Sequence, residues 1–437
     1  MVNCLIVALL CAWPGIVDAR QSPIVLTLDD AIAQGLANSL RLAELQARQD
    51  SAEAIQLGRA AERRPSVAAV GGYTRMNHVE EFVIVQPGLG RQVVYPDIPD
   101  NFRARLDLQW LFYTGGRLDA LERAAQAERQ ASGEDLAAAR ADLRLEITRA
   151  FWVLVTTREA EQVLARSLER IGGYVRDLRA RLDQGLIPPN ELLSAEAQQS
   201  RDRLASIEAT NTRGIAEADL RRLLGNQEPG PIEPAARLDP VVGASANVDE
   251  LIAAAIAARP ERRALAERVA AARARTEAAK SGLRPQVGLN GGYDYASPNP
   301  RFFPRSDEWQ DSWDVSVNAS WTLWDGGRTQ AARAEAEAWA RVAAARLSDF
   351  ERQVAFEVRQ RHLELESSRA AIAATFDGVR AAAEARRVVA ERFTAGVVTN
   401  TEVLDAQTAL LQAELDRTRA LANARVSEAR LARAVGR

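Results

Sequence analysis

The chain has 437 residues, a formal net charge of −3 and two cysteines. This length allows two or three ordinary domains or one elongated body. The near-neutral charge excludes a bulk basic field that would attract nucleic acid, so no nucleic-acid partner is expected.

An apolar stretch at the N-terminus, residues 1–19, predicts a signal peptide. It contains Cys4 and Cys11 and ends in small residues (17–19, VDA) that suit cleavage, although it has no Lys or Arg. A short buried N-terminus and a lipid-anchored start at Cys11 are the alternatives. Cleavage leaves a mature chain without cysteine, so no disulfide holds the fold. No later apolar run approaches the ~18 residues of a membrane helix, which leaves periplasmic, secreted or outer-membrane β-barrel proteins.

The sequence contains an internal duplication, because four landmarks recur in the same order. The offset is 220 residues for the first two landmarks and 211 for the last two, since the stretch between Tyr73 and Gly115 is longer than its counterpart. The matching pairs are 28–39 with 248–259, 64–73 with 284–293, Gly115 with Gly326, and 181–196 with 392–407. We therefore predict repeat 1 at residues 20–226, a Pro- and Gly-rich linker at 227–247 and repeat 2 at 248–437.

Each repeat is predicted to run in the order helix, strand, strand, long helix, shorter helix. In repeat 1 these elements are a helix at about 28–62, strands at about 65–76 and 101–113, a long helix at 116–182 and a helix at 190–224. In repeat 2 they are a helix from about 248, strands at about 285–295 and 312–324, a long helix at 327–394 and a helix at 400–436.

The strand regions alternate between apolar and polar side chains. Residues 102–112 and 313–323 do so strictly, whereas 66–75 and 286–295 do so more weakly. Runs of roughly 9 to 11 residues with this pattern are typical of tilted membrane strands. A soluble sheet half-buried on a core is the alternative. We favour the membrane because the polar face carries Arg103, Arg105 and Asp107, the pattern recurs four times, and the chain is predicted to be exported.

Four strands do not close a barrel, and lipid does not tolerate open sheet edges, so several chains must contribute. The segments at about 77–100 and 296–311 would be outer-face loops. Aromatic residues gather where the second strand of each repeat ends, as in an interfacial girdle. These residues are Trp110, Phe112, Tyr113, Trp321 and Trp324.

Glycine pairs separate the strands from the long helices. Gly115-Gly116 and Gly326-Gly327 allow backbone angles that other residues resist, and each pair is followed by arginine. Pro65 and Pro285 stand at the opposite transition, from helix into strand. We interpret all six positions as joints between the strands and the helices of each repeat.

The long helices carry seven-residue apolar stripes, which predict a coiled-coil seam. Leu136, Leu143, Leu164, Ile171 and Leu178 share one stripe of the first helix. At 1.5 Å per residue, such a helix spans roughly 100 Å. The two shorter helices of each repeat would pack end to end along it, giving a long hairpin bent at GLIPPN or GVVTN.

The whole mature chain resembles outer-membrane efflux proteins of the TolC family. The resemblance rests on the duplicated element order, Arg-Pro at 64 and 284, Gly-Gly-Arg from 115 and 326, and the hairpin tips GLIPPNELLSAE and GVVTNTEVLDAQ. It implies a mixed, mainly α fold: a homotrimer with a twelve-stranded barrel in outer-membrane lipid and a long α-helical barrel in the periplasm. It also implies a passive duct that serves efflux or type I secretion. The implied partners are a periplasmic membrane-fusion adaptor and an inner-membrane pump of RND, ABC or MFS type.

In this family, acidic residues just after the second tip ring the mouth of the tunnel. The matching residues are Glu402 and Asp405, which share one helix face. Threefold symmetry would place six carboxylates around the opening and attract cations. The alternative is a capping box between Thr399 and Glu402 with a solvated Asp405. The equivalent positions of repeat 1 are Glu191 and Ser194.

The hairpin tips are exposed apolar turns by sequence, which makes them candidates for adaptor docking. Ordinary turn packing is the alternative. Some family members lock the closed mouth through an arginine soon after the tip glycine, bonded to an acid of a neighbouring helix. In this chain Val398 stands two residues after Gly396, so this link is not expected. The tip residues are Gly185, Leu186 and Ile187 in repeat 1 and Gly396, Val397 and Val398 in repeat 2.

The sequence offers no catalytic or metal-binding constellation. The two histidines, His78 and His362, lie far apart, and the mature chain has no cysteine to join them. We therefore expect no enzymatic activity and no cofactor. The competing function is a periplasmic coiled-coil adaptor or structural protein without a channel. That class predicts heptads and export, but not four alternating strands with aromatic ends.

Overall fold

The computed structural model describes residues 23–88, 90–225, 230–240 and 247–437. The predicted signal peptide, with Cys4 and Cys11, lies outside the described residues, as do parts of the predicted linker. Within the described residues no helix is both long and apolar enough to cross a membrane.

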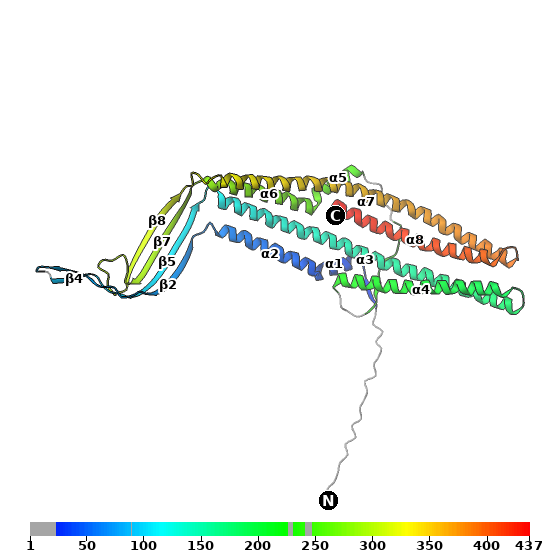
Figure 1. The fold of residues 1–437 in the computed structure, drawn as a ribbon. Coiled ribbons are helices and arrows are strands. Elements are labelled where there is room, and N and C mark those ends of the chain that lie inside the picture. Colours follow the sequence, from blue (N-terminus) through cyan, green and yellow to red (C-terminus); the bar gives the residue numbers. More distant parts are fainter. Residues whose placement is uncertain (1–22, 89, 226–229, 241–246) are drawn as a thin grey trace, which may run out of the picture. The chain divides into compact units, whose positions relative to one another are not determined.

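The elements follow the duplicated order of the sequence (Figure 1). Repeat 1 contains β1 (Ile24–Leu26), α1 (Leu28–Asn38), α2 (Leu40–Ala61), β2 (Ser66–Arg75), β3 (Phe82–Gln86), β4 (Gly90–Tyr95), β5 (Asp100–Tyr113), α3 (Arg117–Asp183) and α4 (Pro189–Leu224). After β6 (Ile232–Pro234), repeat 2 contains α5 (Val248–Ala258), α6 (Pro260–Lys280), the 3-10 turn η1 (Ser281–Leu283), β7 (Gln286–Ser297), β8 (Gln310–Ser320), α7 (Arg328–Thr394) and α8 (Asn400–Val435).

The first helix of each repeat is broken, which corrects the expectation of one continuous helix. In repeat 2 the break is at Arg259, which is extended because the residue before a proline avoids the helical region. In repeat 1 the break is at Ser39, which is also extended although no proline follows it.

Both breaks lie against the end of the last helix of their own repeat. Gly225 and Gly436, one after α4 and one after α8, have positive φ angles of 63° and 88°. A Cβ on Gly225 would lie 2.9 Å from the Cβ of Asn38, and one on Gly436 would lie 3.0 Å from the Cβ of Ala258. Close packing at these contacts therefore requires glycine in both repeats.

The described chain divides into two compact units. Unit 1 takes its residues from Met1–Ser39, Asp142–Ser245 and Arg361–Arg433, and unit 2 takes its residues from Leu40–Ala141, Ala246–Gln360 and Ala434–Arg437. The long helices α3 and α7 therefore contribute residues to both units.

Unit 2 is a single layer in which each strand continues a helix (Figure 1). The strands form one antiparallel sheet in the order β2-β5-β7-β8. The neighbouring helices are bridged in the same order. Arg63, two residues after α2, pairs with Asp119 of α3 at 3.0 Å. Arg275 of α6 pairs with Glu128 of α3 at 3.0 Å, and Arg262 of α6 pairs with Glu351 of α7 at 2.9 Å. Because β5 and β7 pair along their lengths, the two repeats join at the middle of the sheet.

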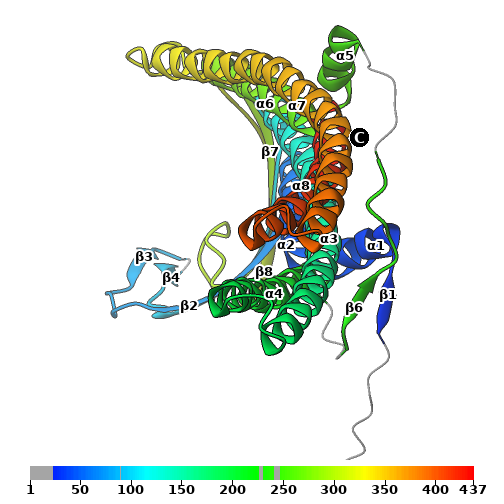
Figure 2. The same cartoon turned by 90° about the vertical axis from the view of Figure 1, so that its right-hand side faces the viewer.

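The segment between β2 and β5 contains a two-stranded hairpin, β3–β4, where the sequence analysis expected a loop. Its residues FVIV and QVVY are rich in β-branched side chains and flank a Pro-Gly pair, which explains why they form strands joined by a turn. Figure 2 shows this hairpin and the segment that joins β7 to β8 on the same side of the sheet.

Unit 1 consists of the α3–α4 and α7–α8 hairpins together with α1 and a two-stranded parallel sheet of β1 and β6. The stripes of α3 are buried as predicted, with Ile171, Val175 and Leu178 at most 5% exposed. They pack against Leu192 of α4 and Leu404 of α8 in one cluster. The hairpins of the two repeats therefore share a core within this unit.

The described part of the predicted linker is attached to unit 1. Arg158 of α3 pairs with Glu233 at 2.8 Å, and the Ile232 backbone N–H donates to Glu217 of α4 at 3.1 Å. Leu238 packs against the α7–α8 hairpin next to Ile372. The segment between the repeats is thus held to helices of both repeats.

The contact between Gly225, after α4, and Asn38, at the break between α1 and α2, can be tested by its effect on stability. Gly225→Ala should lower the free energy of unfolding by about 1–2 kcal/mol, because alanine is strained at positive φ and would crowd Asn38. Gly214→Ala is the matched control, since it lies inside α4 with open space around its Cα. That change should raise stability by up to about 1 kcal/mol. Thermal unfolding followed by circular dichroism measures both, and equal effects would contradict the role of the break.

Candidate functional site

The four-stranded sheet has one apolar face, and that face is exposed in the single chain. Strand register places Leu106 opposite Tyr293, and Tyr293 opposite Trp313. The large apolar side chains of this face that are more than half exposed are Val67, Tyr73, Leu106, Trp313, Val315 and Val317. A surface of this kind is expected to face lipid or a protein partner rather than water.

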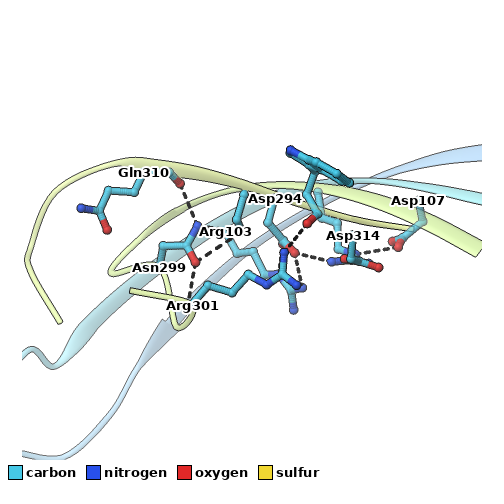
Figure 3. Close-up of polar contacts among 10 residues, drawn as sticks. Arg103, Asp107, Asp294, Asn299, Arg301, Gln310 and Asp314 are labelled. Carbon is cyan, nitrogen blue, oxygen red and sulfur yellow. Dashed lines mark hydrogen bonds and ion pairs between the residues drawn. The ribbon is translucent and has the colours of Figure 1, made fainter. Parts of the chain in front are cut away.

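The opposite face carries a charged belt, which consists of Arg103, Arg105, Asp107, Asp294 and Asp314. Figure 3 labels all of these residues except Arg105. Arg103 of β5 binds both carboxylate oxygens of Asp294 on β7, at 2.5 and 3.0 Å. Arg105 also contacts Asp294, donates to Asp107 at 2.6 Å, and reaches Asp314 of β8 at 3.2 Å. Such charge-assisted pairs are directional, so the belt helps to set the register of three adjacent strands.

Glycine makes the belt possible at its centre. Gly292 stands between Asp107 and Asp314 in the register. A Cβ at Gly292 would overlap the guanidinium of Arg105. Arg105 therefore lies flat across β7 and connects repeat 1 to both strands of repeat 2.

The two glycine pairs lie between strand and long helix, and all four glycines have the positive φ angles expected of them, from 63° to 88°. The residue before each pair caps the helix. Asp325 accepts from the Thr329 backbone N–H at 2.8 Å, and Thr114 accepts from the Leu118 backbone N–H at 3.3 Å. The hydrogen bonds from Thr329 lower the pKa of Asp325. Pro65 and Pro285 directly precede β2 and β7.

The aromatic residues at the strand ends have a second role that the sequence analysis missed. The indole N–H of Trp110 donates to the Arg63 carbonyl, and that of Trp321 donates to the Leu283 carbonyl, both at 2.9 Å. Each tryptophan therefore ties the end of its strand to the chain just before the Arg-Pro pair. This contact recurs at equivalent positions of the two repeats.

Trp321 and Trp324 lie beyond β8, which ends at Ser320 and not near residue 324 as expected. Ser320 pairs with Gln286, the first residue of β7. The residue before it, Pro285, has no N–H to continue the ladder. β5 extends further because a bulge at Phe112 lets Tyr113 pair with Val287. The five aromatic side chains are between 38% and 85% exposed.

The hairpin tips are turns with glycine at φ 71° (Gly185) and 72° (Gly396). The side chains of Leu186 and Val397 are 68% and 65% exposed. Ile187 instead packs against the shared core of the hairpins, and its counterpart Val398 is half-buried. One apolar residue at each tip is thus free to meet a partner, whereas the other takes part in packing.

Glu402 and Asp405 are both exposed at the start of α8. Glu402 accepts from the Thr399 backbone N–H at 3.1 Å, and the Glu402 backbone N–H donates to the Thr399 hydroxyl at 3.4 Å. The structure therefore contains the capping box that the sequence offered as the alternative. The box fixes the Glu402 side chain, while Asp405 remains solvated in the single chain.

A polar link between the two hairpins lies next to these acids, and the sequence analysis did not identify it. The Tyr174 hydroxyl of α3 donates to the side-chain oxygen of Asn400 at 2.7 Å. The Asn400 side-chain amide donates to the Glu191 carbonyl of α4 at 3.0 Å. Asn400 is 5% exposed, and burial, followed by the charge of Glu191, raises the pKa of Tyr174.

Further contacts hold the same two hairpins together. Phe393 of α7 packs edge-on against Tyr174, and the guanidinium of Arg181 lies 5.4 Å from the centre of the Phe393 ring. Arg170 of α3 pairs with Glu414 of α8 at 3.0 Å. The beginning of α8 is thus held to repeat 1 by polar and aromatic contacts together.

The described residues include no group of three or more His, Cys, Asp or Glu side chains that could hold a metal ion. His78, which lies between β2 and β3, is exposed and contacts Asp97, which lies between β4 and β5, at 2.7 Å.

Asn400→Ala should weaken the link between the hairpins by about 1–3 kcal/mol, because it leaves buried polar groups of Tyr174 and Glu191 unpaired. Hydrogen–deuterium exchange should then become faster at the first turn of α8. The control is Thr401→Ala, which changes the next, exposed position. Equal exchange in the two variants would show that the buried amide contributes nothing.

Comparison with known proteins gives a consistent result. The family model described as outer membrane efflux protein matches residues 31–226 and 251–437. The chain is 25% identical to the outer membrane protein TolC of Vibrio cholerae over 92% of this chain and 89% of that one. Its match to protein CyaE of Bordetella pertussis, at 29% identity, spans about half of each chain (53% and 49%).

A solved structure shows the same fold. The outer membrane protein VceC of Vibrio cholerae aligns with a TM-score of 0.78 at 21% identity, over 94% of this chain and 96% of that one. The family match covers both repeats, from α1 to the end of α8. This chain therefore belongs to the outer membrane efflux protein family.

Proposed function

We propose that copies of this chain assemble into an outer-membrane channel that serves as the exit duct of a tripartite efflux or type I secretion system. The channel conducts passively from the periplasm to the outside. An inner-membrane pump supplies the energy, so conduction requires no catalytic group and no cofactor in this chain. Family membership supports the proposal. The main observation behind it is that the four-stranded sheet has an unpaired strand at each edge.

Both edge strands of the sheet, β2 and β8, lack a neighbour on their outer side among the described strands. Backbone N–H and C=O groups left unpaired in lipid are costly, so a membrane sheet must close on itself. A second copy can provide the missing strand by placing its β2 beside β8 of the first. Three copies arranged in this way would close a barrel of twelve strands.

The duplication predicts the contact between copies, because β8 corresponds to β5 and β2 corresponds to β7. Within the chain, Gly115 packs against Arg284, whose side chain donates to the Gly115 carbonyl at 2.9 Å. The equivalent Gly326 has open space around it among the described residues. Arg64 is the equivalent of Arg284, and its side chain forms no hydrogen bond or ion pair with the residues that the structure describes. We infer that Arg64 of one copy packs against Gly326 of the next.

At the other end, the hairpin tips would surround the periplasmic mouth. Glu402 and Asp405 would line this mouth as a ring of acids, and the exposed side chains of Leu186 and Val397 would dock a periplasmic membrane-fusion adaptor. The capping box supports a fixed position for Glu402. The adaptor would connect the duct to a pump of the RND, ABC or MFS type. Docking would open the mouth by separating the two hairpins at the link through Asn400.

Assembly can be tested with cysteine pairs, because both native cysteines precede the described residues. Arg105 pairs with Asp294 in the sheet, so the duplication predicts that Ser316 of one copy faces Thr74 of the next. The Thr74→Cys/Ser316→Cys variant should therefore form cross-linked rings on oxidation, and their size on a denaturing gel gives the number of copies. Within one chain these positions are separated by at least three strand spacings, about 14 Å, which is too far for a disulfide.

The control pair is Thr74→Cys with Val315→Cys, because neighbouring residues of a strand point to opposite faces. It should give no ring. Cross-linking in neither pair, or a monomeric protein in the soluble fraction of cells, would reject the channel and favour a periplasmic coiled-coil protein.

The acidic ring has a separate electrical test. Glu402→Gln with Asp405→Asn should weaken the block of channel conductance by multivalent cations, because it removes negative charge from the narrowest opening. Single-channel recording in planar bilayers measures the block. The control is Asp416→Asn, which lies further along α8 and is half-buried. Unchanged block in the double variant would remove the ring.

A further inference from the structure

The segment that joins β7 to β8, residues 298–309, is held against the sheet by a buried asparagine. We call this segment the β7–β8 loop. Asn299 is 1% exposed. Its side-chain amide donates to the Gln310 carbonyl and to the Ser312 hydroxyl, each at 3.0 Å, and its side-chain oxygen accepts from the Arg301 backbone N–H at 3.0 Å. All the hydrogen-bonding groups of Asn299's side chain are therefore used to fold the loop back on β8.

The loop lies over the polar face of the sheet. Ser312, which Asn299 contacts, is on that face, since Trp313 beside it points to the apolar face. A cavity of about 530 Å³ separates the loop from the strands. Residues of both sides line it: Thr74, Arg103 and Arg105 from the strands, and Pro298, Pro300 and Arg305 from the loop. The loop thus covers part of the face that carries the charged belt (Figure 3).

The β7–β8 loop also contacts the β3–β4 hairpin. Arg305 donates to the Tyr95 hydroxyl at 3.2 Å, and its guanidinium lies 5.3 Å from the centre of the Tyr95 ring. Figure 2 shows both segments on one side of the sheet. One segment comes from each repeat, and the two are joined at the end of the sheet furthest from the glycine pairs.

We propose that the β7–β8 loop, anchored by Asn299 and joined to the β3–β4 hairpin through Arg305, is a size-selective constriction at the outer mouth of the channel. This inference rests on the proposed function, in which the polar face lines the lumen. It adds a second determinant of what passes, separate from the hairpin tips at the periplasmic end. The constriction restricts bulky solutes that enter from outside and leaves small ones free.

The constriction can be tested by thiol labelling of intact cells from outside. Ser316→Cys places a reporter on the polar face, six residues below the end of the loop on β8, or about 20 Å. Phe303→Cys places a second reporter on the loop, where the native side chain is 75% exposed. The probes are N-ethylmaleimide and a maleimide attached to a long poly(ethylene glycol) chain. This assay does not depend on whether the periplasmic mouth is open.

With the native loop, both reporters should react with N-ethylmaleimide, and only the Phe303→Cys reporter should react rapidly with the polymer. Asn299→Ala should speed the reaction of the polymer with the Ser316→Cys reporter by roughly tenfold, because losing the anchor shifts the loop toward open positions. Arg305→Ala, which changes an exposed contact and spares the fold, should speed it by a smaller factor. Phe302→Ala is the matched control and should leave it unchanged.

The inference fails if the polymer reacts with both reporters equally fast in the native loop, or if neither Asn299→Ala nor Arg305→Ala changes its rate. Failure of the proposed function looks different, because the polymer does not cross the outer membrane and would then leave the Phe303→Cys reporter unlabelled in intact cells. Labelling after lysis would confirm that the protein was present.

Discussion

Everything in unit 2 depends on the hydrogen bonds of a sheet that is open at both edges. Lipid offers no partner for the outer N–H and C=O groups of β2 and β8, so the strands are stable in a membrane only when copies complete one another. The apolar face, on which Val315 and Val317 are exposed, fits the same surroundings, because membrane strands turn their apolar side chains toward lipid. On the opposite face, both arginines of the belt are paired with carboxylates, and most of these pairs join different strands.

Because the sequence is duplicated, the same contacts between strands and helices occur in both repeats. The tie from Trp110 to the chain before Arg64-Pro65 recurs at Trp321, and the glycine pair after each strand sets the same change of direction. The breaks next to Gly225 and Gly436 repeat as well. Where repeat 1 meets repeat 2, Gly115 packs against Arg284, and the proposed contact between copies would repeat this pattern. The proposed assembly therefore needs only one kind of seam, both within a chain and between chains.

Sequence periodicity predicted the features that depend on burial, and it missed those that depend on individual polar contacts. Alternation along 102–112 predicted the apolar face of β5, and heptads along α3 predicted the buried stripe of that helix. The structure has both features. The break at Ser39 was missed because no proline marks it. The link from Tyr174 through Asn400 was missed because its residues lie more than 200 positions apart and have no repeated counterpart. For Glu402 the sequence allowed both a ring and a capping box, and a single chain shows only the box.

The two arginines of the belt precede most of their acidic partners in the sequence. Arg103 and Arg105 belong to repeat 1, whereas Asp294 and Asp314 belong to repeat 2. Within the belt, Asp107 is the only acid that repeat 1 supplies, and the other two come from β7 and β8. The belt is therefore complete only after both strands of repeat 2 have joined the sheet, which places its formation late in folding.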